Sequence, residues 1–137
     1  MPKHTDADKK ALAETLFGEA RGESEEGQIG VAGVILNRAE ANKDYWGGSQ
    51  VKDVCEKPGQ FECFQDRDKL RKDIENEQAT YAKMERLSDD ILSGRETRNP
   101  VGNSDHYNNP DKEGYPDHLK NCDKTVKIGG HQFYKGK

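Results

Sequence analysis

The sequence predicts a mainly α-helical domain of the α+β class, a bundle of helices with one small β-hairpin. Two segments with apolar residues at helical spacing, residues 6–41 and 66–92, indicate helices. Near the end of the chain, residues 125–134 alternate between apolar and polar around a glycine pair, which indicates a hairpin. The length of 137 residues corresponds to a single domain, residues 1–137, with one modest core.

The first helix is predicted from Asp6 to Arg21. Thr5 is its expected N-cap, because a threonine hydroxyl can accept from the free amides of the first turn. Its apolar stripe consists of Leu12, Leu16 and Ala20. Gly22 follows at the position where a left-handed residue often ends a helix, and only glycine takes that conformation without strain. We therefore expect Gly22 to be left-handed and to begin a tight corner.

The second helix is predicted from Glu25 to Ala41, with Ser24 as its N-cap. Glu25 and Glu26 lie in its first turn, where the positive end of the helix dipole favours acidic side chains. Residues 28–36 are apolar nearly all round the helix, although only 31% of the chain is hydrophobic. A helix without a polar face is usually buried, so this helix should form the centre of the core.

Shorter elements are predicted for the rest of the chain. Residues 42–49 form a loop, residues 50–56 a short helix, and Pro58-Gly59 a turn. Residues 66–92 form one or two amphipathic helices, closed by Gly94. Residues 95–121 are rich in Asn, Pro, Gly and Asp, which predicts a long loop, and such loops are more often functional than idle. The final hairpin turns at Gly129-Gly130.

The charge pattern excludes one class of function. The formal net charge is −4, and acidic and basic residues are interspersed along the chain. Binding a nucleic acid requires clustered Lys and Arg that neutralise phosphates, and the sequence has no such stripe. No apolar run approaches the length of a transmembrane helix or of a signal-peptide core. We therefore expect neither a nucleic-acid partner nor membrane insertion.

Glu19 is the unusual residue of the first helix, because it lies beside the apolar stripe. A carboxyl group at the edge of an apolar core loses hydration, which favours the protonated form that a general acid needs. The alternative is a solvated carboxylate or an ion-pair partner of Arg21 or Arg38. For Glu23, the pattern favours a simple charge near the start of the second helix.

Four blocks of the chain, in order, resemble motifs of the SleB/CwlJ family of bacterial cell wall hydrolases. The first block is E-A-R-G-E at 19–23, followed by an apolar helix that ends in V-I-L-N-R at 34–38. The second is P-G-Q-F-E-C-F at 58–64, which is similar to the family's P-x-Q-F-S-C-W segment. The third and fourth are D-H-Y-N-N-P at 105–110 and I-G-G-H-Q-F-Y at 128–134. The resemblance extends from about Leu12 to Tyr134.

This resemblance implies a lysozyme-like helical bundle with a substrate cleft, and an enzyme that cleaves peptidoglycan glycan strands without a cofactor. It implies that Glu19 is the general acid and base. In a lytic transglycosylase, the 6-hydroxyl of N-acetylmuramic acid (MurNAc) attacks its own anomeric carbon and forms a 1,6-anhydro end. Because this nucleophile is held within the substrate, a second carboxylate is not required.

Asp105 departs from the family pattern, which usually has threonine before His-Tyr. A carboxylate at this position can assist the attack of water, which would make the protein a hydrolytic muramidase. The alternative for Asp105 is an Asx-turn in a loop. Glu19 and Asp105 are therefore the candidate catalytic residues. We place the transglycosylase interpretation slightly ahead of the hydrolytic muramidase.

The resemblance also implies a set of substrate-binding residues in the cleft: Gln60, Phe61, His106 and Tyr107. Gln60 is expected to provide an amide hydrogen bond, and Phe61 an apolar face for a sugar ring, with plain core packing as the alternative for Phe61. Tyr107 is expected to hydrogen-bond Glu19 or the substrate N-acetyl group, whereas His106 has a structural alternative.

Two other classes of function compete with a glycosidase. A zinc amidase or peptidase, cutting the stem peptide, would take its ligands from Asp105, His106, His118, Cys122 and His131. These residues lack a tight ligand spacing such as H-E-x-x-H. A non-catalytic wall-binding module is the third hypothesis, and replacement of Glu19 by glutamine separates it from an enzyme.

The three cysteines and the charged start of the chain bear on the compartment. The family resemblance implies a Cys55–Cys63 disulfide in an oxidising compartment, whereas in a reducing one Cys55, Cys63 and Cys122 are all thiols. The start M-P-K-H-T-D predicts synthesis in the cytoplasm without a signal peptide. Action on the cell wall would then follow release through a phage holin or delivery on a phage tail. We expect a monomer.

Overall fold

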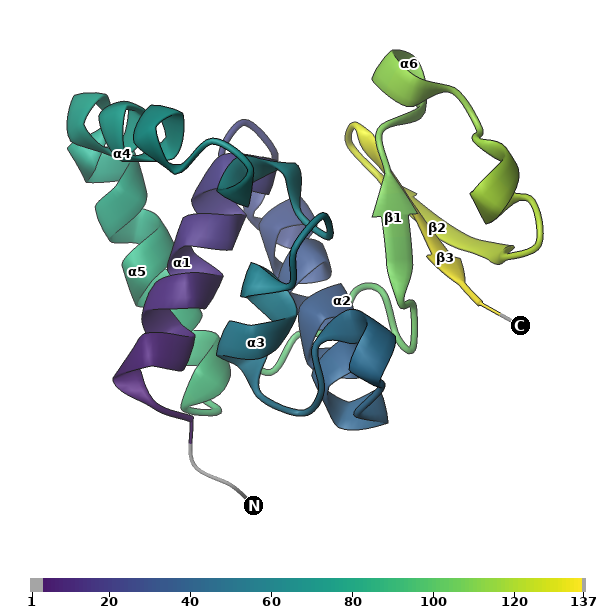
Figure 1. Cartoon of the computed structure of the whole chain (residues 1–137), viewed down its shortest axis with the longest axis horizontal. Coiled ribbons are helices and arrows are strands. Elements are labelled where there is room, and N and C mark those ends of the chain that lie inside the picture. The colour runs from purple at the N-terminus through teal and green to yellow at the C-terminus, as the bar shows by residue number, and fades with distance from the viewer. Residues whose placement is uncertain (1–3, 137) are drawn as a thin grey trace.

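The structure, a computed structural model, describes residues 4–136. Figure 1 shows a bundle of helices and, beside it, a small β-sheet with the short helix α6. The bundle contains α1 (Asp6–Ala20), α2 (Glu25–Ala41), α3 (Val51–Glu56), α4 (Arg67–Asn76) and α5 (Gln78–Leu92). The sheet consists of β1 (His106–Asn108), β2 (Asp123–Ile128) and β3 (His131–Lys135), and the remaining short helices are η1 (Asp44–Trp46), η2 (Glu62–Phe64), α6 (Pro110–Glu113) and η3 (Asp117–Leu119). The predicted class is confirmed.

Helix α1 begins as predicted and ends one residue early. The Thr5 hydroxyl accepts from the Asp8 amide at 3.0 Å, and the Asp8 carboxylate accepts from the Thr5 amide at 2.9 Å. This reciprocal capping box satisfies two of the amides that the first turn leaves free. The prediction for Gly22 was wrong, because Gly22 does not have a positive φ. The corner is closed instead by the Glu23 amide, which donates to the Ala20 carbonyl at 2.9 Å.

Helix α2 has the predicted bounds and lies at the centre of the core. Its Ser24 hydroxyl accepts from the Gly27 amide at 3.2 Å, and its C-cap is Asn42 in the left-handed conformation, φ 53°. The helix packs against α1 and α3 on one side and against β1 and β2 on the other. The largest fully buried apolar side chains of the core are Leu12, Leu16, Phe17, Val31, Val34, Ile35, Val51, Val54, Phe133 and Tyr134.

The segment 66–92 forms two helices rather than one. Asp66 caps α4 by accepting from the Lys69 amide at 3.0 Å. The chain then leaves helical geometry at Glu77, with φ −130° and ψ 49°, and α5 runs along α1. Gly94 has φ +83°, so the predicted glycine stop of this segment is confirmed.

The sheet is antiparallel with strand order β1-β3-β2. The predicted hairpin is confirmed as β2 and β3, which turn at Gly129 with φ +55°. The prediction of a continuous loop over 95–121 was wrong, because β1, α6 and η3 lie within it. Strand β1 has three residues and pairs with β3, with Tyr107 opposite Phe133. Three residues are too few to show a period, and the partner strand lies far along the chain.

Within residues 4–136, the structure contains no helix whose length and apolar character would allow it to cross a membrane.

Two glycines let the sheet and the loop that precedes it approach α2. A Cβ atom at Gly30 would lie 2.9 Å from Cζ of Phe133 and 3.0 Å from Cγ1 of Val101, and one at Gly33 would lie 2.8 Å from Cγ2 of Val101. We predict that Gly30→Ala destabilises the protein by about 1–2 kcal/mol, since overpacking of a rigid core outweighs the helix propensity gained. Chemical unfolding of the purified protein measures this change.

The matched control for this prediction is Gly22→Ala. A Cβ atom at Gly22 would meet no heavy atom within 4 Å, and its backbone is not left-handed. This variant is expected to be neutral or more stable by up to about 1 kcal/mol. Equal stability of the two variants would contradict close packing between α2 and the sheet.

Candidate active site

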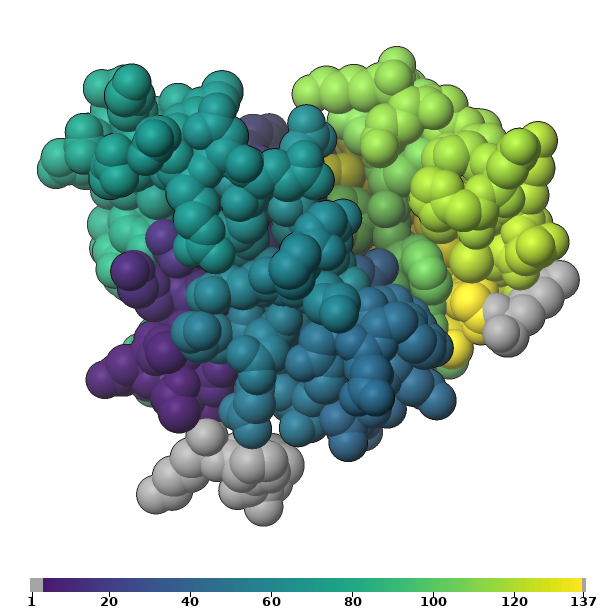
Figure 2. Space-filling view, viewed as in Figure 1, coloured from purple at the N-terminus to yellow at the C-terminus, as the bar shows by residue number. Residues whose placement is uncertain are grey.

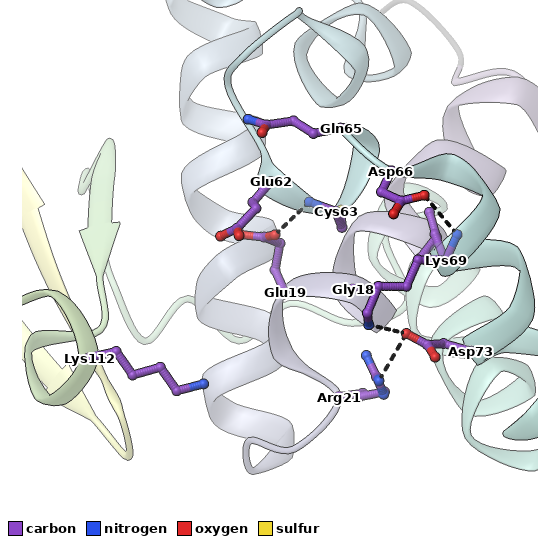
Figure 3. Close-up of a pocket in the computed structure, with 11 residues that line it drawn as sticks. Gly18, Glu19, Arg21, Glu62, Cys63, Gln65, Asp66, Lys69, Asp73 and Lys112 are labelled. Carbon is purple, nitrogen blue, oxygen red and sulfur yellow. Dashed lines mark hydrogen bonds and ion pairs between the residues drawn. The ribbon is translucent and has the colours of Figure 1, made fainter.

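A cavity of about 590 Å³ lies between the helical bundle and α6. In Figure 2 it corresponds to the hollow between the teal segment that includes α4 and the green segment that includes α6. Its lining includes seven charged side chains, those of Glu19, Arg21, Glu62, Asp66, Lys69, Asp73 and Lys112. Figure 3 shows Lys112 projecting from α6 across the cavity towards the helices. The predicted cleft is therefore present, and Glu19 lines it.

Glu19 lies in the last turn of α1, and its carboxylate is held from two sides. The Tyr107 hydroxyl donates to Oε1 at 2.7 Å, and the Cys63 amide donates to Oε2 at 3.4 Å. Burial, together with the neighbouring Glu19 charge, raises the pKa of Tyr107 well above its ordinary value, so this hydroxyl remains a donor. The predicted contact between Tyr107 and Glu19 is present.

Gly18 explains how the Cys63 amide comes this close to α1. A Cβ atom at Gly18 would overlap the Cys63 Cβ and would lie 2.8 Å from its Sγ. The absence of a side chain at Gly18 therefore lets η2 pack directly on the last turn of α1. Figure 3 shows the result, with the backbone of η2 placed beside the Glu19 carboxylate.

The other charged residues of the E-A-R-G-E motif join α1 to the rest of the chain. Arg21 donates to the Glu77 carboxylate at 3.0 Å and lies 3.6 Å from Asp73, so it connects α1 to α4 and α5. The Gly130 amide donates to Oε1 of Glu23 at 3.0 Å, which connects the corner to the turn of the hairpin. The prediction that Glu23 is a simple helix-start charge was wrong, and Glu19 is not an ion-pair partner of Arg21.

The polar residues of α2 fix the corner before it and the chain leading to β1. The side-chain amide of Gln28 donates to the backbone carbonyls of Ala20 at 3.2 Å and Glu23 at 3.1 Å. Asn37 donates to the carbonyls of Gly102 and Ser104, and Arg38 donates to the Asp105 carbonyl at 2.8 Å. Because β1 follows this segment directly, these contacts position β1 along α2 and so place Tyr107 opposite Glu19.

Asp105 lies outside the lining of this cavity. Its Oδ1 accepts from the Gly136 amide at 2.8 Å and lies 2.8 Å from Nδ1 of His106, and its Oδ2 accepts from Lys135 at 3.1 Å. Burial is the largest single influence and opposes the shift, but these three partners together lower the pKa of Asp105. The side chain joins the ends of β1 and β3, a geometry that does not support the predicted water-assisting role.

Two predicted substrate-binding residues, Gln60 and Phe61, have their side chains engaged by other parts of the protein. Phe61 is only 4% exposed and belongs to the core, so it cannot present an apolar face to a sugar. The side-chain amide of Gln60 donates to the backbone carbonyls of Trp46 at 3.0 Å and Val54 at 2.7 Å. Gln60 therefore joins η1 to α3 through its side-chain amide, and neither Gln60 nor Phe61 lines the cavity with Glu19.

His106 and Tyr107 are neighbours on β1 with different surroundings. The ring of His106 lies edge-on to Trp46, with centroids 5.8 Å apart, and its Nδ1 contacts Asp105. Strand geometry sends successive side chains to opposite faces, so only Tyr107 reaches Glu19. The contacts of His106 with Asp105 and Trp46 thus fit the structural alternative given for this residue.

Comparison with known proteins connects this geometry to a family. The sequence profile of the cell wall hydrolases matches residues 22–134. The chain belongs to the cell wall hydrolase family. The predicted SleB/CwlJ-type family is thereby confirmed, although the matched range begins at Gly22 and does not include Glu19. No curated protein sequence is significantly similar to the chain.

Solved structures with this fold include two SleB catalytic domains. The catalytic domain of the germination-specific lytic transglycosylase SleB from Bacillus anthracis is 26% identical, with a TM-score of 0.68, over 98% of this chain and 100% of that one. The catalytic domain of the Bacillus cereus SleB protein is also 26% identical, with a TM-score of 0.71, over 98% of this chain and 94% of that one. The cell wall hydrolase therefore has the fold of these domains over nearly its whole length.

The described part of this cell wall hydrolase contains no site for the zinc ion of the amidase or peptidase hypothesis. Within residues 4–136, no three His, Cys, Asp or Glu side chains lie in a group that could hold a metal ion. Two of the histidines proposed as ligands have different neighbours. His106 contacts Asp105 and Trp46, whereas His131 packs on Tyr107.

The predicted Cys55–Cys63 disulfide is not formed in this structure. Cys55 is buried in the core beside Thr15, and burial raises its pKa to about 12. Burial, together with the Glu19 charge, also raises the pKa of Cys63. Both side chains are therefore thiols at neutral pH, which makes them poor nucleophiles.

Gly18, Glu62 and Lys112 are among the cavity residues that were not predicted from the sequence. Gly18 directly precedes the E-A-R-G-E block, and Glu62 lies within the second block, where the family segment has serine, so closer inspection of these two blocks would have found both. Lys112 lies in the segment that was predicted as loop, and no periodicity or motif in the sequence marks it.

His131 supports Tyr107 from the sheet and should make stability depend on pH. Its ring lies 5.0 Å from that of Tyr107, and its buried Nδ1 has no hydrogen-bond partner among the described residues. Burial lowers the pKa of His131, although the charges of Glu23 and Glu19 act in the opposite direction and Lys112 adds to the lowering.

The sign of the predicted effect follows from this lowered pKa. As pH falls through about 6.5, the unfolded chain binds a proton at His131 before the folded protein does, so acidification favours unfolding. We predict that His131→Phe loses less stability between pH 7 and pH 5 than the wild type. Urea unfolding at both pH values measures the difference, and parallel losses in the two proteins would contradict the prediction.

Proposed function

We propose that this enzyme cleaves the β-1,4 glycosidic bond between MurNAc and N-acetylglucosamine in peptidoglycan, with Glu19 as general acid and then base. The observation that carries this proposal is the Glu19 carboxylate, which faces a polar cavity and is held by Tyr107 and by the Cys63 amide. Membership of the cell wall hydrolases and the similarity to a SleB lytic transglycosylase support the substrate class.

The two oxygens of Glu19 have different surroundings, which suggests how the proton moves. Oε1 accepts a short hydrogen bond from Tyr107, 2.7 Å, whereas the contact of Oε2 with the Cys63 amide is long, 3.4 Å. We propose that Oε2 carries the transferred proton. It passes to the glycosidic oxygen as the bond from that oxygen to the anomeric carbon breaks, and positive charge develops at the anomeric carbon.

The main second step is the attack of the MurNAc 6-hydroxyl on its own anomeric carbon. The hydroxyl oxygen bonds to the anomeric carbon, and its proton passes to Oε2 of Glu19, which restores the acid. The product is a 1,6-anhydroMurNAc end. An attacking group within the same sugar has a high effective concentration, so this step requires no second carboxylate.

Mass spectrometry of soluble muropeptides tests the proposal. Purified peptidoglycan digested by the wild type is expected to yield 1,6-anhydroMurNAc ends, and Glu19→Gln is expected to yield almost none. Intact glycan strands with cut stem peptides would overturn the proposal in favour of an amidase or peptidase. Binding to the wall without any soluble product would overturn it in favour of a binding module.

A further inference from the structure

Glu62 also lines the cavity of Glu19, and its carboxylate has no partner among the described residues. Of the other acidic residues in the lining, Asp66 caps α4 through the Lys69 amide, and Asp73 lies between Lys69 and Arg21 at 2.8 and 3.6 Å. Among residues 4–136, no hydrogen bond or ion pair holds the Glu62 side chain, which is exposed to water. Its carboxylate is therefore free to act on a molecule in the cavity.

The backbone places Glu62 close to Glu19. The amide that donates to Oε2 of Glu19 at 3.4 Å is that of Cys63, the next residue in the chain. Standard bond lengths then put the Cα of Glu62 within about 6 Å of Oε2. Figure 3 shows both side chains directed towards the same part of the cavity. Rotation about the Glu62 side-chain bonds brings its carboxylate nearer to Glu19 or farther away over several ångströms.

We propose that Glu62 activates water in this cavity, so that part of the substrate is hydrolysed instead of being converted to anhydro ends. Inverting glycosidases hold their two carboxyl groups about 6.5–9.5 Å apart, which leaves room for a water molecule, and Glu62 can reach such a separation. This inference rests on the proposed function of Glu19.

In the hydrolytic step, a water molecule replaces the MurNAc 6-hydroxyl as the attacking group. Glu19 gives its proton to the glycosidic oxygen, which leaves with the electron pair of the broken bond. The oxygen of a water molecule bonds to the anomeric carbon, and Glu62 accepts a proton from that water. The proton then passes through solvent back to Glu19, and the product is a reducing MurNAc end. Water and the 6-hydroxyl thus compete for the same anomeric carbon.

The test is the ratio of reducing to anhydro ends made by the wild type, Glu62→Gln and Asp68→Asn. Borohydride reduces the reducing ends and leaves the 1,6-anhydro ends unchanged, so mass spectrometry distinguishes the two. Asp68 lies on α4, pairs with Arg71 at 3.1 Å and is 79% exposed outside the cavity, so its variant matches the change in charge.

The wild type and Asp68→Asn are expected to give both kinds of ends in the same ratio. Glu62→Gln is expected to lower the share of reducing ends at least about tenfold, since loss of a general base typically costs 10²–10⁴-fold, and to retain the anhydro ends. Anhydro ends alone from the wild type, or an unchanged ratio in Glu62→Gln, would overturn the role of Glu62 and leave that of Glu19 intact. Absence of glycan cleavage by the wild type would instead overturn the proposed function itself.

Discussion

Replacement of Glu19 by glutamine is expected to lower the rate of glycan cleavage by about 10²–10⁴-fold, the usual contribution of a general acid or base. Glutamine has nearly the same shape as glutamate but has no acidic proton to give to the glycosidic oxygen. Its carbonyl oxygen can still accept from the Tyr107 hydroxyl, whereas its NH2 group can only donate and would face the Cys63 backbone N–H. We therefore expect a folded protein with a cost of about 1 kcal/mol for the weakened contact.

Release of soluble muropeptides per unit time from purified peptidoglycan measures this loss, and circular dichroism confirms the fold of the variant. Glu26→Gln is the matched control, because Glu26 is an exposed residue in the first turn of α2 and does not line the cavity. Its activity should equal that of the wild type. A Glu19→Gln protein that is folded and within tenfold of wild-type activity would remove Glu19 from the catalytic role.

Phe133→Ala is expected to have the largest effect on stability, a loss of about 3–5 kcal/mol. Phe133 is fully buried where β3 meets α2, and its ring packs against Gly30, which has no side chain. In the sheet it lies opposite Tyr107. Removing the ring leaves a cavity that the helix and the sheet cannot both collapse into. For a domain of this size, the loss corresponds to a fall in Tm of roughly 10 °C or more.

The fall is measured by thermal unfolding followed by circular dichroism, with Tyr45→Ala as control. Tyr45 is also aromatic but 65% exposed, so its truncation should change stability by about 0.5 kcal/mol or less. Because Phe133 also backs Tyr107, with ring centroids 5.8 Å apart, Phe133→Ala should reduce activity at temperatures where the protein remains folded. Similar Tm values for the two variants would contradict the packing of the sheet on α2.

The helical elements were predictable because their signals are local. The Thr5 cap, the bounds of α2, the stop at Gly94 and the hairpin turn at Gly129 each depend on residues within a few positions of one another. Gly22 shows the limit of this reasoning. A glycine after a helix is compatible with a left-handed cap, but the Glu23 amide closes this corner by another route.

The roles of the motif residues were less predictable, because a motif names residues without giving the direction of their side chains. The second block contains a core residue, Phe61, a residue that joins η1 to α3, Gln60, and a cavity residue, Glu62. Adjacent positions in such a segment point in different directions, and the packing of η2 on Gly18 decides which of them faces the cavity.

The sequence alone determined the family, the helical class and the position of Glu19 near the end of a buried helix, since these depend on motifs and short-range periodicity. Tertiary structure decided that Tyr107 contacts Glu19 and that the Asp105 carboxylate joins strand ends instead. It also decided that Glu62 and Lys112 share the cavity. The physical reason is that β1 takes its orientation from pairing with β3 and from its attachment to α2, contacts between residues far apart in the chain that leave no periodic signal in the residues themselves.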